Sequence, residues 1–157
     1  IFVWGGRNGN NSQVNNVTNT MYVFEADKWK SYDFDNAPNP RASYSATLLD
    51  DRIIYIGGIS KKPYPYPDVN FLEELLIFDT KKLEWSIQPS TSDKKIANRA
   101  FHSALLCSDS ISIIMYGGIY EIWYIEKGNF QLNETQIPNS DSVWILNTKT
   151  WTWSQQS

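Results

Sequence analysis

Short apolar runs separated by polar turns dominate the chain, and no segment has convincing helical periodicity. Three of these runs close on a pair of glycines, and the pairs start 52 and 60 residues apart. The β-branched and aromatic residues in the runs favour strands. A repeating unit of roughly 50 residues made only of strands is therefore predicted. The three runs are Phe2-Val3-Trp4-Gly5-Gly6, Ile54-Tyr55-Ile56-Gly57-Gly58 and Ile114-Met115-Tyr116-Gly117-Gly118.

The sequence around the second and third glycine pairs also repeats. Upstream, Arg41-Ala42-Ser43-Tyr44-Ser45-Ala46 aligns with Arg99-Ala100-Phe101-His102-Ser103-Ala104. Downstream, every unit ends at a tryptophan that polar residues flank. Each unit therefore predicts four strands, which are an inner strand, the run into the glycines, an apolar block and a half-buried outer strand. The inner strands are expected at 42–49 and 100–107, and the apolar blocks at 21–24, 75–78 and 143–146.

Clusters of small polar residues separate the predicted strands. Asp50-Asp51, Asp79-Thr80-Lys81-Lys82 and Ser108-Asp109-Ser110 each lie between two apolar runs. Short side chains of this kind can bond the backbone one or two residues ahead. We therefore expect tight turns at these positions.

This order of an arginine, a serine-containing strand, a Gly-Gly strand, an apolar strand, an Asp/Asn turn and a tryptophan resembles the kelch repeat, the unit of β-propellers such as the galactose-oxidase-like central domain. The resemblance implies an all-β fold of four-stranded antiparallel blades. It also implies that the glycines take positive φ and leave space for an aromatic neighbour. The structural positions on this reading are Gly5, Gly6, Trp29, Gly57, Gly58, Trp85, Gly117, Gly118 and Trp153.

The repeat divides the chain into an incomplete first blade at 1–35, a second at 36–93 and a third at 94–157. The first blade has no inner strand, so the chain holds under three blades. Propellers close with about four to eight blades. We therefore expect a segment of a six- or seven-bladed propeller, whose remaining blades come from a longer chain or from association.

Long connections on one face are the predicted place of function. In an antiparallel blade, the connections between the second and third strands all leave at the same end, here 7–20, 59–74 and 119–141. Rigid scaffolds often carry their binding residues on such loops. A protein or peptide ligand is expected to contact aromatic and arginine side chains there. The candidates are Arg7, Arg41, Tyr64, Tyr66, Arg99, Tyr120, Trp123 and Tyr124.

Two of these assignments have alternatives. The segment around Trp123 could instead form a β-hairpin, and we weigh that equally with a binding role. Arg41 and Arg99 start the inner strands, and a pairing with a carboxylate or a carbonyl between blades is favoured over contact with a ligand.

Charge and composition narrow the partners. A formal net charge of −3 and a pI near 5.1 provide no basic field for nucleic-acid phosphates. No run is long enough for a membrane span in this segment. The compartment stays open: the sequence slightly favours the cytoplasm, while the sequons at Asn10, Asn16 and Asn133 would also suit secretion or the cell surface.

Catalysis is the alternative to weigh against binding. A copper site like that of galactose oxidase needs two histidine ligands, whereas this chain has the single His102 and the single Cys107. No phosphate loop or nucleophile elbow is present, so we expect no cofactor and no metal site in this segment. The favoured function is a non-catalytic binding module. The alternative is a substrate- or carbohydrate-binding part of a secreted oxidase or another carbohydrate-active protein.

Overall fold

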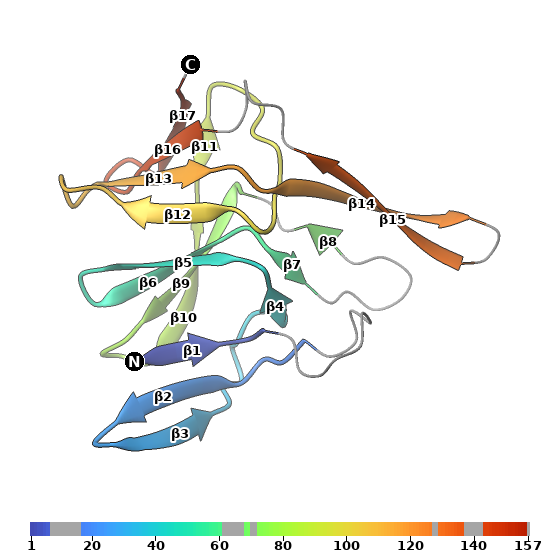
Figure 1. The fold of residues 1–157 in the computed structure, drawn as a ribbon. Helices are drawn as coiled ribbons and strands as arrows, with labels where there is room; N and C mark the ends of the chain where they lie inside the picture. Colours follow the sequence, from blue (N-terminus) through green and yellow to red (C-terminus); the bar gives the residue numbers. More distant parts are fainter. Residues whose placement is uncertain (7–16, 61–67, 70–71, 127–128, 137–142, 157) are drawn as a thin grey trace.

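The fold is all-β, as the sequence predicts. The computed structural model describes residues 1–6, 17–60, 68–69, 72–126, 129–136 and 143–156, with the backbone alone at 68–69, 120–126 and 129–136. Its described residues form strands, turns and irregular segments without a helix. Three principal antiparallel sheets lie side by side, and the chain passes from one to the next (Figure 1). This arrangement is that of consecutive propeller blades.

The first sheet has three strands and the second has four. In the first, the order is β1-β2-β3, and in the second it is β10-β9-β6-β5. In the second sheet, the strands follow one another along the chain from the inner strand β5 to the outer strand β10. The described part of the first sheet begins instead at β1, the run into Gly5 and Gly6. The strands are β1 (Phe2–Trp4), β2 (Met21–Glu25), β3 (Lys28–Tyr32), β5 (Ser45–Leu49), β6 (Arg52–Ile56), β9 (Glu74–Asp79) and β10 (Glu84–Pro89).

The third sheet has the same four strands and one more at its outer edge. The order is β11-β17-β16-β13-β12, with β11 (Thr91–Ser92) parallel to β17 (Thr152–Gln155). β11 belongs to the crossover between the second and third sheets, so this connection is hydrogen bonded to the sheet that it leads into. The remaining strands are β12 (Ser103–Leu106), β13 (Ser112–Tyr116) and β16 (Val143–Asn147).

Asx turns close the sheets at the end opposite the glycines. The Oδ1 atom of Asp79 accepts hydrogen bonds from the backbone N–H groups of Lys81 and Lys82 at 3.0 and 2.8 Å. Asp109 does the same for Ile111 and Ser112 at 2.9 and 2.8 Å. The predicted turn chemistry is confirmed at these two positions.

The inner strands are shorter than the sequence predicts. Expected at 42–49 and 100–107, they begin only at Ser45 in β5 and at Ser103 in β12. The interruption falls at Ser43 and Phe101, whose φ angles are 58° and 57°. These left-handed residues turn the chain out of the sheet, and the N–H of Phe101 donates to the carbonyl of Ser43 in the neighbouring repeat at 2.9 Å. An alternating side-chain pattern gives no sign of such a local turn.

The chain just after the second and third glycine pairs is hydrogen bonded to the segment that starts at the arginine of the same repeat. In the second repeat, β4 (Arg41–Ala42), β7 (Ile59–Ser60) and β8 (Asp68–Val69) form a small sheet. In the third repeat, a bridge joins Ala100 to Ile119, the first residue of β14 (Ile119–Glu126), which pairs with β15 (Asn129–Gln136). The β14–β15 hairpin is thus the longer counterpart of β7–β8. Figure 1 shows it reaching away from the three sheets.

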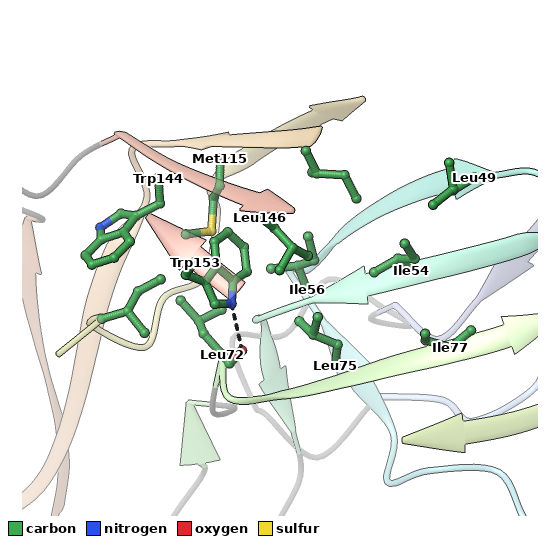
Figure 2. Close-up of a cluster of buried hydrophobic side chains, with 12 residues drawn as sticks. Leu49, Ile54, Ile56, Leu72, Leu75, Ile77, Met115, Trp144, Leu146 and Trp153 are labelled. Carbon is green, nitrogen blue, oxygen red and sulfur yellow. Dashed lines mark hydrogen bonds between the residues drawn. The ribbon is translucent and has the colours of Figure 1, made fainter. Parts of the chain in front are cut away.

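Two buried clusters fill the spaces between the sheets. Strand β9 is buried on both faces because its alternate residues enter different clusters. Leu75 and Ile77 join the cluster shared with the third sheet, which Figure 2 shows, and Leu76 and Phe78 join the one shared with the first. The first cluster is mainly aliphatic. The second is rich in aromatic rings, and the ring centroids of Trp4, Tyr55 and Trp85 lie within 5.3 Å of one another.

Candidate functional site

Arg41 is a buried link between two glycine pairs. Its carbonyl oxygen accepts a hydrogen bond from the N–H of Gly6 at 2.9 Å, and its Nη1 atom donates to the carbonyl of Gly57 at 3.1 Å. Burial lowers the pKa of its guanidinium to about 10, which Glu74 and Tyr44 partly oppose. The group therefore stays charged at neutral pH. Its Nε atom has no hydrogen-bond partner among the described residues.

Arg99 repeats this geometry one sheet further along. Its carbonyl accepts from the N–H of Gly58 at 3.0 Å, and its Nη1 atom donates to the carbonyl of Gly117 at 3.3 Å. Its Nε atom donates to the carbonyl of Ala97 at 3.1 Å, and the residue is 0% exposed. The two arginines thus connect three glycine pairs in series. The guanidinium groups bond carbonyls of their own repeats, whereas the favoured sequence interpretation is a pairing between blades. The bonds that cross between repeats are those that the backbone carbonyls of the two arginines accept.

Gly57 and Gly58 make the close approach of these backbones possible. Their φ angles are 61° and 87°, which residues with a side chain rarely adopt. A Cβ atom on Gly57 would collide with the carbonyl oxygen of Arg99, and one on Gly58 would lie 2.6 Å from the carbonyl oxygen of Ala42. The nearest neighbours of these two glycines are therefore the backbone at Ala42 and Arg99, where the second and third repeats begin, and the side chains of Tyr44 and His102.

Tyr44 and His102 occupy the same position in successive repeats and bond the sheet before their own. The Tyr44 hydroxyl donates to the carbonyl of Trp4. His102 Nε2 lies 2.9 Å from Ser45 Oγ. Burial, and secondarily the nearby charge of Arg99, lower the pKa of His102 to about 4. Its Nδ1 atom has no hydrogen-bond partner in the part of the chain that the structure describes. The sequence alignment brought these two residues into register, but their cross-sheet bonds were not predicted.

The tryptophans of the outer strands have different surroundings. Trp85 and Trp153 are buried, at 8% and 3% exposure, each facing the sheet before its own. Trp153 Nε1 donates to the carbonyl of Leu72 at 3.2 Å and to Ser90 Oγ at 3.1 Å (Figure 2 shows the bond to Leu72). Trp85 Nε1 has no hydrogen-bond partner among the described residues. Trp29 is 56% exposed, and its ring lies 5.1 Å from that of Phe24.

The aromatic binding candidates of the third repeat lie in a strand. Residues 120, 123 and 124 belong to β14, so the hairpin alternative describes their backbone. Successive positions of a strand point to opposite faces. Positions 120 and 124 therefore share one face of the ribbon and position 123 lies on the other. Asn133, expected in a loop, lies in β15. Arg7, Tyr64, Tyr66, Asn10 and Asn16 fall outside the described residues.

The two ends of the sheets differ in the amount of chain that they carry. At one end, tight turns such as those at Asp79 and Asp109 close the strands. At the other end, residues 57–73 separate the paired strands β6 and β9, and residues 117–142 separate β13 and β16. Those connections contain β7, β8, β14 and β15. We call this second end the loop end, and the first the turn end.

The described residues offer little for other kinds of site. No group of three or more histidine, cysteine, aspartate or glutamate side chains among them is placed to hold a metal ion. In the same part of the chain, no helix has the length and apolar character to cross a membrane.

The fold and the repeated arginine–glycine links define a repeat protein built from consecutive antiparallel blades. Comparison with known families agrees, because the model of the KLHDC2/KLHL20/DRC7 Kelch-repeats domain matches residues 1–157. The chain belongs to the kelch-repeat family. Kelch domains are in general protein-interaction modules.

Individual relatives are distant in sequence and larger than this chain. Alpha-scruin of Limulus polyphemus is 33% identical over 119 residues, which are 75% of this chain and 12% of that protein. Kelch domain-containing protein 2 of Homo sapiens is 27% identical over 182 aligned residues, which cover 99% of this chain and 40% of that protein. Ras guanine nucleotide exchange factor F of Dictyostelium discoideum is 27% identical over 119 residues, 75% of this chain and 10% of that protein.

Proposed function

We propose that this chain is a non-catalytic kelch module that binds a protein or peptide at its loop end. The observation that carries the proposal is the unequal distribution of chain between the two ends. The sheets need only short turns to connect antiparallel strands, as the turn end demonstrates. The loop end instead holds two hairpins of different length on the same base, a form suited to recognition on a fixed scaffold.

The buried arginines support a separation between residues that stabilise the scaffold and loop residues that contact the partner. The Nη1 atoms of Arg41 and Arg99 donate to backbone carbonyls inside their own repeats. A ligand would have to replace these buried bonds to engage the guanidinium groups, at a cost in free energy. We therefore assign the contacts with the partner to Arg7 and to the loop-end aromatics Tyr64, Tyr66, Tyr120, Trp123 and Tyr124. We assign to Arg41 and Arg99 the structural role of fixing the backbone at the glycine pairs.

Cross-linking of the full-length protein to its captured partners tests which end binds. Lys61, Lys62 and Lys127 belong to the connections at the loop end, whereas Lys28, Lys81 and Lys149 lie beside turns at the other. With a lysine-reactive reagent, we expect partner cross-links at the first three positions. Cross-links confined to the turn end would overturn the proposal.

Paired substitutions provide a second test. Tyr64→Ala with Tyr66→Ala should weaken capture of the cross-linked partner and leave the circular dichroism spectrum unchanged. Lys28→Ala with Lys149→Ala, at the turn end, is the matched control and should bind like the parent protein. Unchanged binding by the tyrosine variant would remove these two residues from the site.

A further inference from the structure

Among the strands that the structure describes, the β14–β15 hairpin has no partner beyond its base. β14 and β15 pair with each other from Ile119↔Gln136 to Glu126↔Asn129, and they form a sheet of two strands. The bridge from Ile119 to Ala100 is the contact that ties this ribbon to the inner segment of the third repeat. An isolated two-stranded hairpin is marginally stable in water. Beyond its base, the ribbon reaches away from the three sheets and pairs with none of their described strands (Figure 1).

The register of the hairpin separates its residues into two unlike faces. On one face, positions 120, 122 and 124 hold Tyr, Ile and Tyr, opposite Thr135, Asn133 and Gln131. On the other, Trp123 pairs with Leu132 and Ile125 pairs with Phe130, so both strands place apolar residues there. We call these four positions, 123, 125, 130 and 132, the apolar tip face. Apolar residues on both strands of one face are what a packed interface requires.

Two glutamates lie next to the apolar tip face. Glu121 and Glu134 are direct register partners and alternate with Trp123 and Leu132, so they share the face with them. Like charges directly opposite each other destabilise an antiparallel pair. The hairpin as a whole holds three glutamates and one lysine. A cationic group placed between Glu121 and Glu134 would remove the repulsion, so the free hairpin has more to gain from a basic ligand than from a neutral or acidic one.

We propose that the apolar tip face of β14–β15 docks a basic, amphipathic segment of a partner protein, with apolar residues over positions 123, 125, 130 and 132 and a lysine or arginine between Glu121 and Glu134. The inference rests on the proposed function, because it names the class of partner for one part of the loop end. The same glutamates disfavour phosphate-rich nucleic acid and anionic lipid, which the Coulomb repulsion would keep away.

Three synthetic peptides test the chemistry directly on the full-length protein. Each has about twelve residues, long enough for one extended strand, and alternates leucine with lysine, serine or glutamate. By fluorescence anisotropy, the lysine peptide should bind most tightly and lose affinity as salt is raised from about 0.05 to about 0.5 M, since salt screens exposed charges. Equal binding of all three peptides, or none by the lysine peptide, would overturn the proposal.

Two double variants locate the site. Trp123→Ser with Phe130→Ser should abolish binding of the lysine peptide. Glu121→Gln with Glu134→Gln should weaken it by about fivefold or more and make the lysine and serine peptides bind alike. Because the glutamine variant removes a like-charge pair, the hairpin itself becomes more stable, and unfolding cannot explain that loss. Gln131→Ala with Thr135→Ala, on the opposite face, is the control and should bind as the parent does.

Other occupants and the fate of the underlying proposal are separate outcomes. The protein could instead bind phosphatidylcholine vesicles and lose this binding in the Trp123→Ser/Phe130→Ser variant, or it could self-associate through the same face. Either result would identify another occupant of the apolar tip face and overturn the inference. Peptide binding that fails while partner cross-links persist at Lys61 and Lys62 would reject the hairpin inference alone. Cross-links confined to the turn end would reject the proposed function.

Discussion

At the scale of single residues, a buried arginine has to be compensated by hydrogen bonds because it loses its hydration. Arg99 meets this demand with the carbonyls of Ala97 and Gly117. Arg99→Leu removes these donors and leaves buried carbonyl oxygens without them. We expect the free energy of unfolding to fall by roughly 2–4 kcal/mol in urea titrations. Arg52→Leu, at a partly exposed strand end, should change it by only about 0.5 kcal/mol or less. Equal losses would show that the bonds of Arg99 do not stabilise the fold.

His102 should make stability depend on pH. Its pKa falls from 6.5 to about 4 on folding, chiefly through burial and secondarily through Arg99. The unfolded chain therefore takes up this proton first as the pH drops. The contribution to stability is complete above pH 6.5 and is lost between about 6.5 and 4. Because a shift of one pKa unit corresponds to about 1.4 kcal/mol, the loss of stability between pH 6.5 and 4 is about 3 kcal/mol at most.

His102→Gln removes the titrating group and is the natural comparison for this pH dependence. The difference in unfolding free energy between the parent protein and the variant should shrink as the pH falls from 7 to 4. Urea titrations at each pH measure this difference. Carboxylates that titrate in the same range are common to both proteins and cancel. A difference that stays constant over this range would contradict the buried, neutral imidazole.

At the scale of elements, the outer strands β10 and β17 provide a matched pair. Trp153 Nε1 has two acceptors, the Leu72 carbonyl and Ser90 Oγ, while Trp85 Nε1 has no partner among the described residues. Trp153→Phe should therefore destabilise the protein by about 1–2 kcal/mol more than Trp85→Phe, the value of a lost hydrogen bond to a buried acceptor. Thermal unfolding of both variants checks this. A larger effect at Trp85 would show that the hydrogen bonds from Trp153 to Leu72 and Ser90 do not stabilise the fold.

The elements that sequence reasoning recovered are those whose signal is local. Apolar runs into a glycine pair and an aspartate at a turn carry their structure within a few residues, as Asp79 and Asp109 show. The inner strands are shorter than the sequence predicts because Ser43 and Phe101 leave the sheet and bond each other, which is an interaction between repeats. The pairing of β11 with β17 also joins two repeats, and a local pattern does not predict it.

The candidate site was predictable in place more than in form. The unequal length of the connections is visible in the sequence and identifies the loop end. The separation of Tyr120 and Tyr124 from Trp123 follows only from the register of β14 with β15, and the sequence interpretation had treated these three residues as one surface. Register depends on the turn at the tip and on pairing over eight positions, which a pattern of apolar residues does not specify.

At the scale of the whole molecule, the two clusters should respond independently to substitution. Ile53 lies in the cluster between the first two sheets, and Ile113 lies in the cluster between the second and third. Stacked repeats contact only their neighbours. Ile53→Val and Ile113→Val should each cost about 0.5–1.5 kcal/mol, and the double variant should match their sum within about 0.5 kcal/mol by urea unfolding. A clear departure from additivity would indicate that the second sheet transmits strain between its faces.

The series of bonds through Gly6, Arg41, Gly57, Gly58, Arg99 and Gly117 also has a consequence for engineering. These bonds fix the pitch from one repeat to the next before the chain enters its connections, so the length of a connection is free to vary without changing the pitch. Foreign binding loops could therefore be grafted between Gly118 and Val143, or between Ser60 and Leu72, and inherit a rigid base. The chain thus combines a repeated scaffold with connections of unequal length, which is the starting point that the design of loop libraries requires.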